Sequence, residues 1–416
     1  MKFKLSKDDL IKSSKFKHIS ILISFVFERD FTKNGYMELL TSILSDSCEK
    51  YNTKMALYKK MYELYNVNLF IYNANNFNTS SLIVNLEFLN PKYVNNDNLI
   101  DEVFSFFKEV LFNPLLNEEK NGFDEKVFDE HKETCLSIQR NIYNKKHSYA
   151  FIKLINNMKR EDELTLINPL DENLYKSIKN EDLYKFYQDI FKKSKVFVKA
   201  SGDIEYDLLN KKINELNLDT KDININVNNN KNYEINEVKR FEEVQDISQS
   251  HIDLGFRTTI AFNDPLYVAY LTFSTMFGGM FNSTLSTNIR EKMSLVYNIS
   301  ASLLPEEKIF YVRSANDSNK CDLIIENVLK ELKNYQDNNI ENGEELLKLA
   351  KEDIINGLND TYDSASGLVS QALKYDLRGF RNDKEFFELL DKVSLNDIIE
   401  AAKTIKLDTI FILRGK

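Results

Sequence analysis

Two side chains in one segment of the chain, Arg290 and Tyr297, could together bind and polarise a peptide carbonyl. A guanidinium and a phenol hydroxyl both donate hydrogen bonds to carbonyl oxygens. Both lie in residues 277–297, which read FGGMFNSTLSTNIREKMSLVY. The same spacing also fits a core helix with a solvated arginine and a half-buried tyrosine, so the residue types alone make the pair a candidate.

This segment is predicted to bend, form a short helix and end in a strand. Gly278 and Gly279 indicate a bend or a close approach of the backbone, since glycine alone tolerates positive φ at little cost. Asn282 and Ser283 are good N-cap residues. The apolar residues that follow recur at every fourth position: Leu285, Ile289 and Met293. Residues 295–301 then read as a strand, which places the arginine near the helix end and the tyrosine on the strand.

The segment resembles the C-terminal-domain signature of the pitrilysin/insulinase-type zinc peptidases. That signature is a double glycine, then Ser-x-Leu, Arg-Glu and Leu-x-Tyr. Its counterparts here are Gly278-Gly279, Ser283-Thr284-Leu285, Arg290-Glu291 and Leu295-Val296-Tyr297. The resemblance implies that Arg290 and Tyr297 contact the substrate backbone and assist the zinc site of the other domain. It also implies that the two glycines let the loop backbone come close to a bound peptide.

The metal-binding motif of that family is missing. Active members carry H-x-x-E-H on the first helix of the first domain, where two histidines on one helix face bind zinc and the glutamate is the general base. The corresponding helix here begins at Asn34-Gly35, and the motif positions fall on Glu38, Thr41 and Ser42. The chain has only four histidines, and no two of them are four residues apart. We therefore expect no zinc in this chain.

The histidines and cysteines of the chain offer few other sets of metal ligands or catalytic groups. His131 and Cys135 are four residues apart on one helix face, but a structural zinc usually takes four ligands, so a polar helix face is the favoured interpretation. His147 is expected in a solvated turn and His251 on a strand face. A Ser/His/Asp or Cys/His triad stays open, although no G-x-S-x-G sequence occurs.

The second half of the chain repeats the first. The apolar and acidic positions Leu57, Met61, Glu63 and Val67 recur at the same spacing within residues 285–295. Three further segments of the first half match segments of the second half, and the number of residues that separates each matched pair shrinks slowly along the chain. Strands and helices come in blocks, which favours α+β over a regular βαβ alternation. We therefore predict an α+β fold of two homologous domains, each a mainly antiparallel sheet packed with helices. The predicted boundaries are 1–215, a polar linker at 216–245, and 246–416.

Composition excludes several classes of protein. The net charge is −9 and no basic stripe with interleaved aromatics occurs, which argues against nucleic-acid binding. No apolar run approaches the length of a membrane span. Three cysteines, an odd and widely spaced set, fit a reducing compartment without a disulfide framework. Together with the absence of signal-peptide features, this predicts a cytoplasmic protein.

The sequence retains Arg290 and Tyr297, which would contact the substrate, but lacks the zinc-binding motif. This combination leads to two hypotheses. In the first, the chain is inactive alone and is the peptide-binding subunit of a heterodimeric metallopeptidase, whose zinc-bearing paralogous partner supplies the metal. In the second, it is a peptidase-derived structural or peptide-binding protein without a proteolytic role. A homodimer of the isolated chain and an independent enzyme with an unrecognised site are left open.

Overall fold

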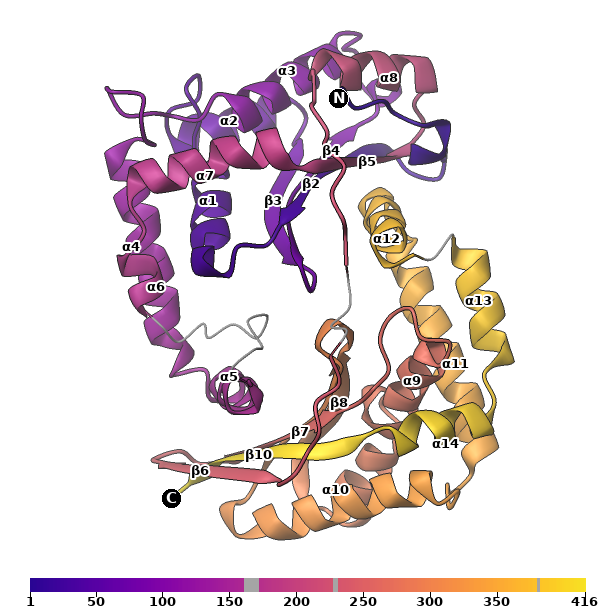
Figure 1. The fold of residues 1–416 in the computed structure, drawn as a ribbon. Helices are drawn as coiled ribbons and strands as arrows, with labels where there is room; N and C mark the ends of the chain where they lie inside the picture. Colours follow the sequence, from indigo (N-terminus) through magenta and orange to yellow (C-terminus); the bar gives the residue numbers. More distant parts are fainter. Residues whose placement is uncertain (161–171, 227–230, 380–381) are drawn as a thin grey trace. The chain divides into compact units, whose positions relative to one another are not determined.

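The computed structural model describes residues 1–160, 172–226, 231–379 and 382–416 and contains two compact units (Figure 1). Unit 1 is built from the described residues of Met1–Gln139, Asp171–Asn226 and Asp360–Leu377. Unit 2 is built from those of Arg140–Leu170, Val227–Asn359 and Arg378–Lys416. Each unit has one five-stranded sheet, and each is described below by itself.

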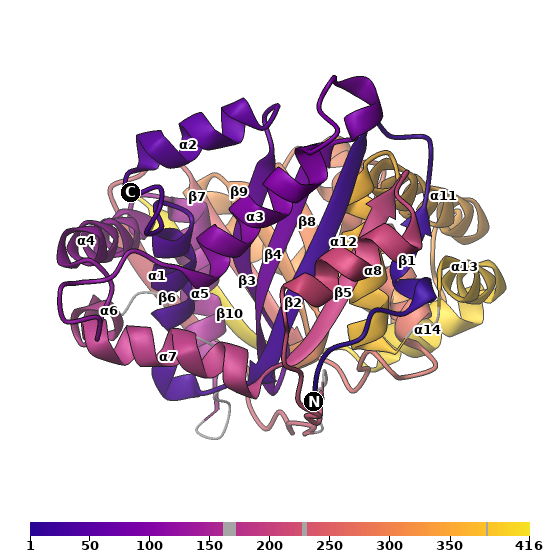
Figure 2. The ribbon, with the colours of Figure 1, turned by 90° about the horizontal axis from the view of Figure 1, so that it is seen from above.

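The sheet of unit 1 has the strand order β1-β5-β2-β4-β3. The strands are β1 Leu10–Lys12, β2 His18–Glu28, β3 Asn68–Asn75, β4 Thr79–Leu89 and β5 Lys195–Gly202. All neighbours are antiparallel except β1 and β5. The helices of the N-terminal part are α1 Tyr36–Leu44, α2 Lys54–Glu63, α3 Leu99–Phe112, α4 Glu125–Ile142, α6 Glu172–Lys176, α7 Asn180–Lys193 and α8 Tyr206–Glu215. Helices α3, α7 and α8 cross one face of the sheet (Figure 2).

The sheet of unit 2 has the strand order β6-β10-β7-β9-β8. Its strands are β6 Lys239–Gln245, β7 Ser250–Arg257, β8 Val296–Leu304, β9 Ile309–Asn316 and β10 Lys406–Gly415. Here β6 and β10 are the parallel pair, and the other neighbours are antiparallel. The helices include α9 Tyr267–Ser274, α10 Cys321–Gln336, α11 Gly343–Thr361, α13 Asp383–Lys392 and α14 Leu395–Lys403.

The two sheets match strand for strand, including the single parallel pair at the same edge. The match extends to a local detail before the last strand in each order. Asn66 precedes β3 and Ser294 precedes β8, and both have positive φ, at 59° and 51°. The predicted α+β fold with a duplicated domain is therefore confirmed.

Each unit also contains a helix from the other half of the sequence. Helix α12 (Ala365–Arg378) belongs almost wholly to unit 1, where Val369 and Leu373 pack against Leu22 and Ile83 of the sheet. Helix α5 (Lys146–Met158) belongs to unit 2, where its residues share a buried cluster with strand residues. That cluster includes Tyr149, Leu154 and Met158 of the helix and Ile309, Phe411 and Leu413 of the sheet.

The linear division at 1–215, 216–245 and 246–416 stays a prediction. Within the segment interpreted as a linker, residues 239–245 form β6, whose sequence KRFEEVQ gave no strand signal because this edge strand is largely polar and exposed. Residues 227–230 of that segment lie outside the described residues.

All three cysteines, Cys48, Cys135 and Cys321, are buried free thiols. Within the described ranges, no helix combines the length and the hydropathy that crossing a bilayer requires.

Candidate functional site

The signature segment of unit 2 contains two π-helical turns, η4 Thr275–Gly279 and η5 Ser286–Lys292. In each, a backbone amide bonds the carbonyl five residues earlier: Met280 to Thr275 and Met293 to Asn288, both at 3.2 Å. The expected bend, short helix and strand are present, but the helix has the wider π form. Such turns occur frequently at functional sites of proteins.

Gly278 and Gly279 differ in their surroundings. Gly278 is buried, and a Cβ there would lie 2.6 Å from both the Cβ and the backbone nitrogen of Ala301 on β8. Gly279 is exposed, and its nearest neighbour would be the Ser274 carbonyl oxygen at 3.2 Å. Gly278 therefore allows η4 to contact β8. The close approach of Gly278 or Gly279 to a bound peptide stays a prediction.

Gly278→Ala is expected to destabilise the protein by about 1–3 kcal/mol, because the added methyl overpacks the contact between η4 and β8. Gly357→Ala is the matched control, since a Cβ at that position of α11 meets nothing within 4 Å. It should stabilise the protein by roughly 0.5–1 kcal/mol. Urea unfolding of both variants checks this, and equal effects of the two substitutions would contradict it.

Tyr297 lies on a β-bulge at the start of β8. Val296 pairs with Asn316 and Asn298 with Ala315, so Tyr297 is the extra residue. Its side chain is 60% exposed, and its hydroxyl donates to Asp317 Oδ1 at 2.7 Å. That hydrogen bond to the Asp317 carboxylate raises the pKa of the Tyr297 phenol above its ordinary value. A substrate carbonyl would compete with Asp317 for this hydrogen. Bulges often re-aim side chains near active sites.

Arg290 lies in η5 and makes two contacts. Its Nη2 is 3.0 Å from Glu291 Oε1, and its guanidinium lies over the ring of Phe281, 4.9 Å from the centroid. Phe281 is 74% exposed. The guanidinium is thus held against a solvent-facing aromatic ring, with further N–H groups available to an acceptor. In the described chain Arg290 and Tyr297 have separate partners.

The degenerate motif positions Glu38, Thr41 and Ser42 lie on α1 in unit 1. Thr41 donates to the carbonyl of Glu38 at 3.1 Å, and Ser42 Oγ is hydrogen-bonded to Nδ1 of His131 at 2.5 Å. A zinc site requires thiolate, imidazole or carboxylate ligands, and two hydroxyl groups here do not fit that ion. Among the residues that the structure describes, no group of three or more His, Cys, Asp or Glu side chains is placed to hold a metal.

Ser42, His131 and Asp46 form a serine–histidine–carboxylate cluster. His131 Nε2 is 3.5 Å from Asp46 Oδ1, longer than a good hydrogen bond. Ser42 lies inside α1, where backbone amides are bonded to carbonyls four residues earlier and so do not form an oxyanion hole. The cluster therefore supports a structural link between α1 and α4 rather than a nucleophile.

Cys135 lies one helical turn from His131 on α4 and is buried. Burial and, to a lesser extent, Glu38 raise the pKa of its thiol to about 11. Such a thiol is protonated at neutral pH and is therefore neither a good nucleophile nor a good metal ligand.

A further polar cluster lies on the sheet of unit 2, close to the start of α5. Arg313 Nε donates to Asp253 Oδ1 at 2.7 Å, and Arg313 Nη2 donates to the carbonyl of His147. The rings of His147 and His251 are 5.8 Å apart. Burial and the charge of Arg313 lower the pKa of both histidines, and burial raises the pKa of Asp253 to about 7. His147 is the second residue of α5, so the turn predicted there is wrong, whereas His251 lies on a strand as predicted.

His251→Gln is expected to change how stability depends on pH. A histidine whose pKa is lowered by folding stabilises the fold fully above its unfolded pKa of about 6.5, and this contribution is lost as the pH falls towards the lowered value. Asp253 acts in the opposite direction, because its raised pKa lets the folded protein take up a proton as the pH falls below about 7. Asp253 is present in both proteins, so the difference in free energy of unfolding between wild type and His251→Gln reports the contribution of the histidine.

Urea unfolding at pH 7 and pH 5 measures that difference. The stability advantage of the wild type over His251→Gln should shrink at the lower pH. A difference that stays constant between the two pH values would contradict the assignment.

Sequence reasoning missed Phe281 and Asp317, the contact partners of the candidate pair. Phe281 lies inside the signature, but nothing in its spacing distinguishes an exposed aromatic from a core one. Asp317 reaches Tyr297 only through the pairing of β8 with β9, which brings residues 20 positions apart together. The candidate pair lies in unit 2 and the degenerate motif in unit 1.

Comparison with known proteins gives consistent results. The family model described as "Peptidase M16 inactive domain" matches residues 177–352, which include the signature segment. A curated relative, "Probable inactive metalloprotease YmfF" of Bacillus subtilis (strain 168), is 23% identical over 98% of this chain and 95% of its own length.

Solved structures share the fold. A conserved protein from Enterococcus faecalis V583 superposes with a TM-score of 0.87 at 22% identity, covering 98% of this chain and 96% of the other. A peptidase M16 inactive domain from Pseudomonas fluorescens superposes with a TM-score of 0.77 at 13% identity, covering 100% and 98%. The resemblance predicted from the sequence is confirmed: residues 177–352 match the M16 inactive-domain model, and the chain is similar over nearly its whole length to a probable inactive metalloprotease and shares the fold of an M16 inactive domain.

Proposed function

We propose that this chain is the non-catalytic, substrate-binding subunit of a heterodimeric zinc metallopeptidase that acts on peptides in the cytoplasm. A zinc-bearing paralogous subunit would supply the metal and the general base. Arg290 and Tyr297 would donate hydrogen bonds to the bound peptide, Tyr297 to the scissile carbonyl as it becomes an oxyanion. The observation that carries the proposal is the exposed Tyr297 phenol, kept on a β-bulge in a chain whose motif positions lack both histidines and the general-base glutamate.

The edge of the unit 2 sheet supports binding of an extended peptide. β8 is the last strand in the sheet order and pairs only with β9 among the described strands. A free strand edge offers backbone N–H and C=O groups to which an incoming peptide can add. The bulge places the exposed Tyr297 on this edge strand, so a peptide paired with β8 would pass close to it.

A specific observation favours the second candidate, a peptidase-derived structural or peptide-binding protein. Tyr297 is hydrogen-bonded to Asp317, and Arg290 is paired with Glu291 and stacked on Phe281. These contacts would also explain both residues as surface-packing groups. The two candidates differ in whether the chain increases the activity of a zinc-bearing paralogue.

The decisive experiment is co-purification from the native host, followed by mass spectrometry and a peptidase assay. We expect a paralogue carrying H-x-x-E-H to co-purify. The isolated chain should hold no stoichiometric zinc and cleave no peptide, and the mixture should gain activity that neither chain has alone. One tightly held zinc per isolated chain with chelator-sensitive activity would overturn the proposal. A purified complex without peptidase activity would favour the second candidate.

A further inference from the structure

Strand β6 (Lys239–Gln245) is the last strand at one edge of the unit 2 sheet (Figure 1). Among the described strands it pairs only with β10, in parallel and along its whole length. Pairing on one side leaves a second row of backbone N–H and C=O groups at the free edge. The strand has seven residues, as many as a typical strand needs, so this edge can accept another strand of similar length.

The side chains along this edge form a palindrome of chemical types. Residues 238–244 read VKRFEEV, in which two basic residues precede the central Phe241, two acidic residues follow it and a valine lies at each end. When two identical strands pair antiparallel about a two-fold axis at the phenylalanine, every basic residue faces an acidic one and every valine faces a valine. A parallel pair would instead place like charges opposite each other. The segment is therefore complementary to a second copy of itself in the antiparallel direction.

The charged positions of the palindrome make four favourable cross-strand pairs. Lys239 faces Glu243 of the second copy, and Arg240 faces Glu242 of the second copy. The two-fold axis generates each pair twice. Opposite charges directly across an antiparallel pair stabilise it, whereas like charges destabilise it. Edge strands are commonly protected from pairing by their charges, but here the basic half and the acidic half of the strand attract those of another copy.

The apolar positions of the palindrome are exposed in the single chain. Val238, Phe241 and Val244 are 43%, 39% and 56% exposed. In the antiparallel register the two phenylalanines would meet at the axis, and each valine would lie opposite a valine of the other copy. Pairing therefore covers apolar surface at the same positions where it satisfies the free backbone edge.

Contacts within unit 2 already orient two of the charged side chains. Arg240 Nη2 is 2.6 Å from Asp322 Oδ1, and Arg414 Nε is 2.5 Å from Glu242 Oε1. Pairing Arg240 with Glu242 of a second copy would join these ion pairs into a row in which positive and negative charges alternate. Since both side chains are partly fixed beforehand, pairing costs less side-chain conformational entropy.

We infer that two copies of this chain associate through β6, in an antiparallel ladder with its two-fold axis at Phe241 that joins their unit 2 sheets edge to edge. Strand β8, to which the peptide is proposed to add, is the opposite edge of the same sheet and stays free. The inference does not depend on Arg290, Tyr297 or a zinc-bearing partner, and the absence of a paralogue or of peptidase activity would not alter the results expected below.

Cysteine cross-linking of the full chain tests the register. Phe241→Cys places two thiols across the axis, where opposite Cα atoms are about 4.5–5.5 Å apart, within the range of a disulfide. The three native cysteines are buried, so they give little background. We expect Phe241→Cys to form a covalent dimer under mild oxidation. Val244→Cys is the matched control, because its two copies would lie roughly 20 Å apart and should not cross-link. A mixture of Val238→Cys and Val244→Cys should cross-link.

Sedimentation equilibrium of charge variants tests the pairing independently. One strand from each copy makes a small interface, so we expect a dissociation constant on the order of 10–100 μM for the wild type. Arg240→Glu and Glu242→Arg each place like charges opposite each other twice, and each should weaken the dimer at least about 10-fold. An equimolar mixture of these two variants should dimerise again, because every facing pair is then of opposite charge.

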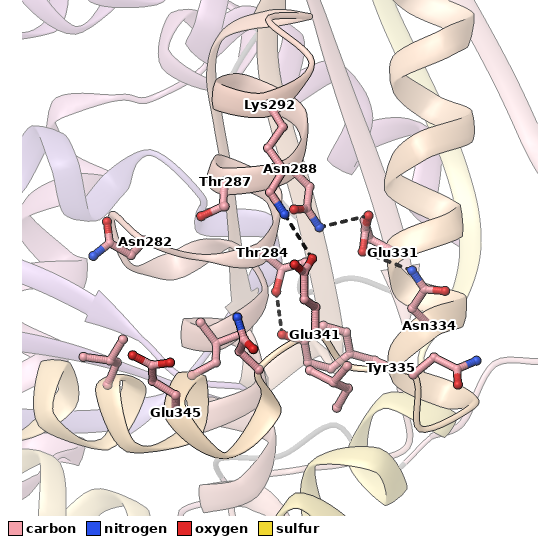
Figure 3. Close-up of a pocket in the computed structure, with 15 residues that line it drawn as sticks. Asn282, Thr284, Thr287, Asn288, Lys292, Glu331, Asn334, Tyr335, Glu341 and Glu345 are labelled. Atoms are coloured by element: carbon pink, nitrogen blue, oxygen red, sulfur yellow. Dashed lines mark hydrogen bonds and ion pairs between the residues drawn. The ribbon is translucent and has the colours of Figure 1, made fainter.

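Glu345→Arg is the matched control for charge reversal. Glu345 is exposed on α11, beside a cavity of unit 2 that no residue of β6 lines (Figure 3), so its reversal should leave the dimer unchanged. Circular dichroism checks that each variant keeps the fold.

The inference is overturned if the wild type stays monomeric at about 200 μM, well above the expected dissociation constant. Equal cross-linking of Phe241→Cys and Val244→Cys, or full dimerisation of both charge variants alone, also overturns it. Cross-linking of Phe241→Cys to a co-purified paralogue in place of a second copy would assign this edge to that partner and overturn self-association.

Discussion

Tyr297→Phe is expected to lower kcat of the proposed heterodimer, reconstituted with its zinc-bearing partner, by about 100-fold, while assembly of the two subunits is unchanged. Phenylalanine keeps the ring on the β8 bulge but deletes the hydroxyl that now donates to Asp317. A donor that acts on the developing oxyanion is used in the transition state, so kcat should fall more than KM rises. A 100-fold loss corresponds to about 2.7 kcal/mol of transition-state stabilisation. Steady-state kinetics with a quenched fluorescent peptide measures it.

Two further variants make this prediction specific. Arg290→Lys keeps the charge but loses the planar fork, so it should also reduce activity. Tyr62→Phe is the matched control, since Tyr62 is a 74% exposed tyrosine on α2 of unit 1 and should leave the kinetics unchanged. Full activity of both Tyr297→Phe and Arg290→Lys would show that the pair is structural, and the binding-protein alternative would then be the better account.

Leu373→Ala is expected to destabilise unit 1 by about 2–5 kcal/mol, although the residue lies near the C-terminus of the sequence. Leu373 is 3% exposed on α12 and packs with Val369 against Leu22 and Ile83. Removing the leucine leaves a cavity over the centre of the β2–β4 pair. Hydrogen exchange followed by mass spectrometry should show faster exchange in β2 and β4, with much smaller changes in β7 and β9.

Leu389→Ala supplies the control for this substitution. Leu389 lies on α13 and is 40% exposed, so its truncation should change stability by no more than about 0.5 kcal/mol. If Leu373→Ala accelerated exchange only in the strands of unit 2, the assignment of α12 to unit 1 would be wrong.

Elements with a strong local pattern were predictable from the sequence. Residues 18–27 are an apolar run that forms β2, and the apolar positions of 99–111 form the buried stripe of α3. In both cases the pattern and the burial come from the same consecutive residues. The helix before β8 was predicted in the right place, but its π form depends on bonds to carbonyls five residues back, which apolar spacing does not reveal.

Elements whose partner surface is distant in sequence were not predictable. Neither α5 nor α12 was expected, and each covers a sheet built mostly from the other half of the sequence. The bond between Ser42 and His131 joins residues 89 positions apart, and no local signal marks it. Sequence reasoning found the candidate pair because its motif is contiguous, whereas Asp317 and Phe281 required the folded chain.

The packing of α12, a helix from the end of the sequence, in unit 1 has a consequence for synthesis of the chain. Unit 1 lacks the cover of Leu22 and Ile83 until Asp360–Leu377 leaves the ribosome, after most of unit 2 has been translated. The rest of unit 1 is translated by Asn226, so at about 5–20 residues per second the delay before Asp360 is on the order of 7–27 s. During this interval the nascent sheet presents the apolar side chains of Leu22 and Ile83 to solvent. The domain that is translated first is therefore completed late, and nascent chains stalled before residue 360 are expected to be substrates for ribosome-associated chaperones.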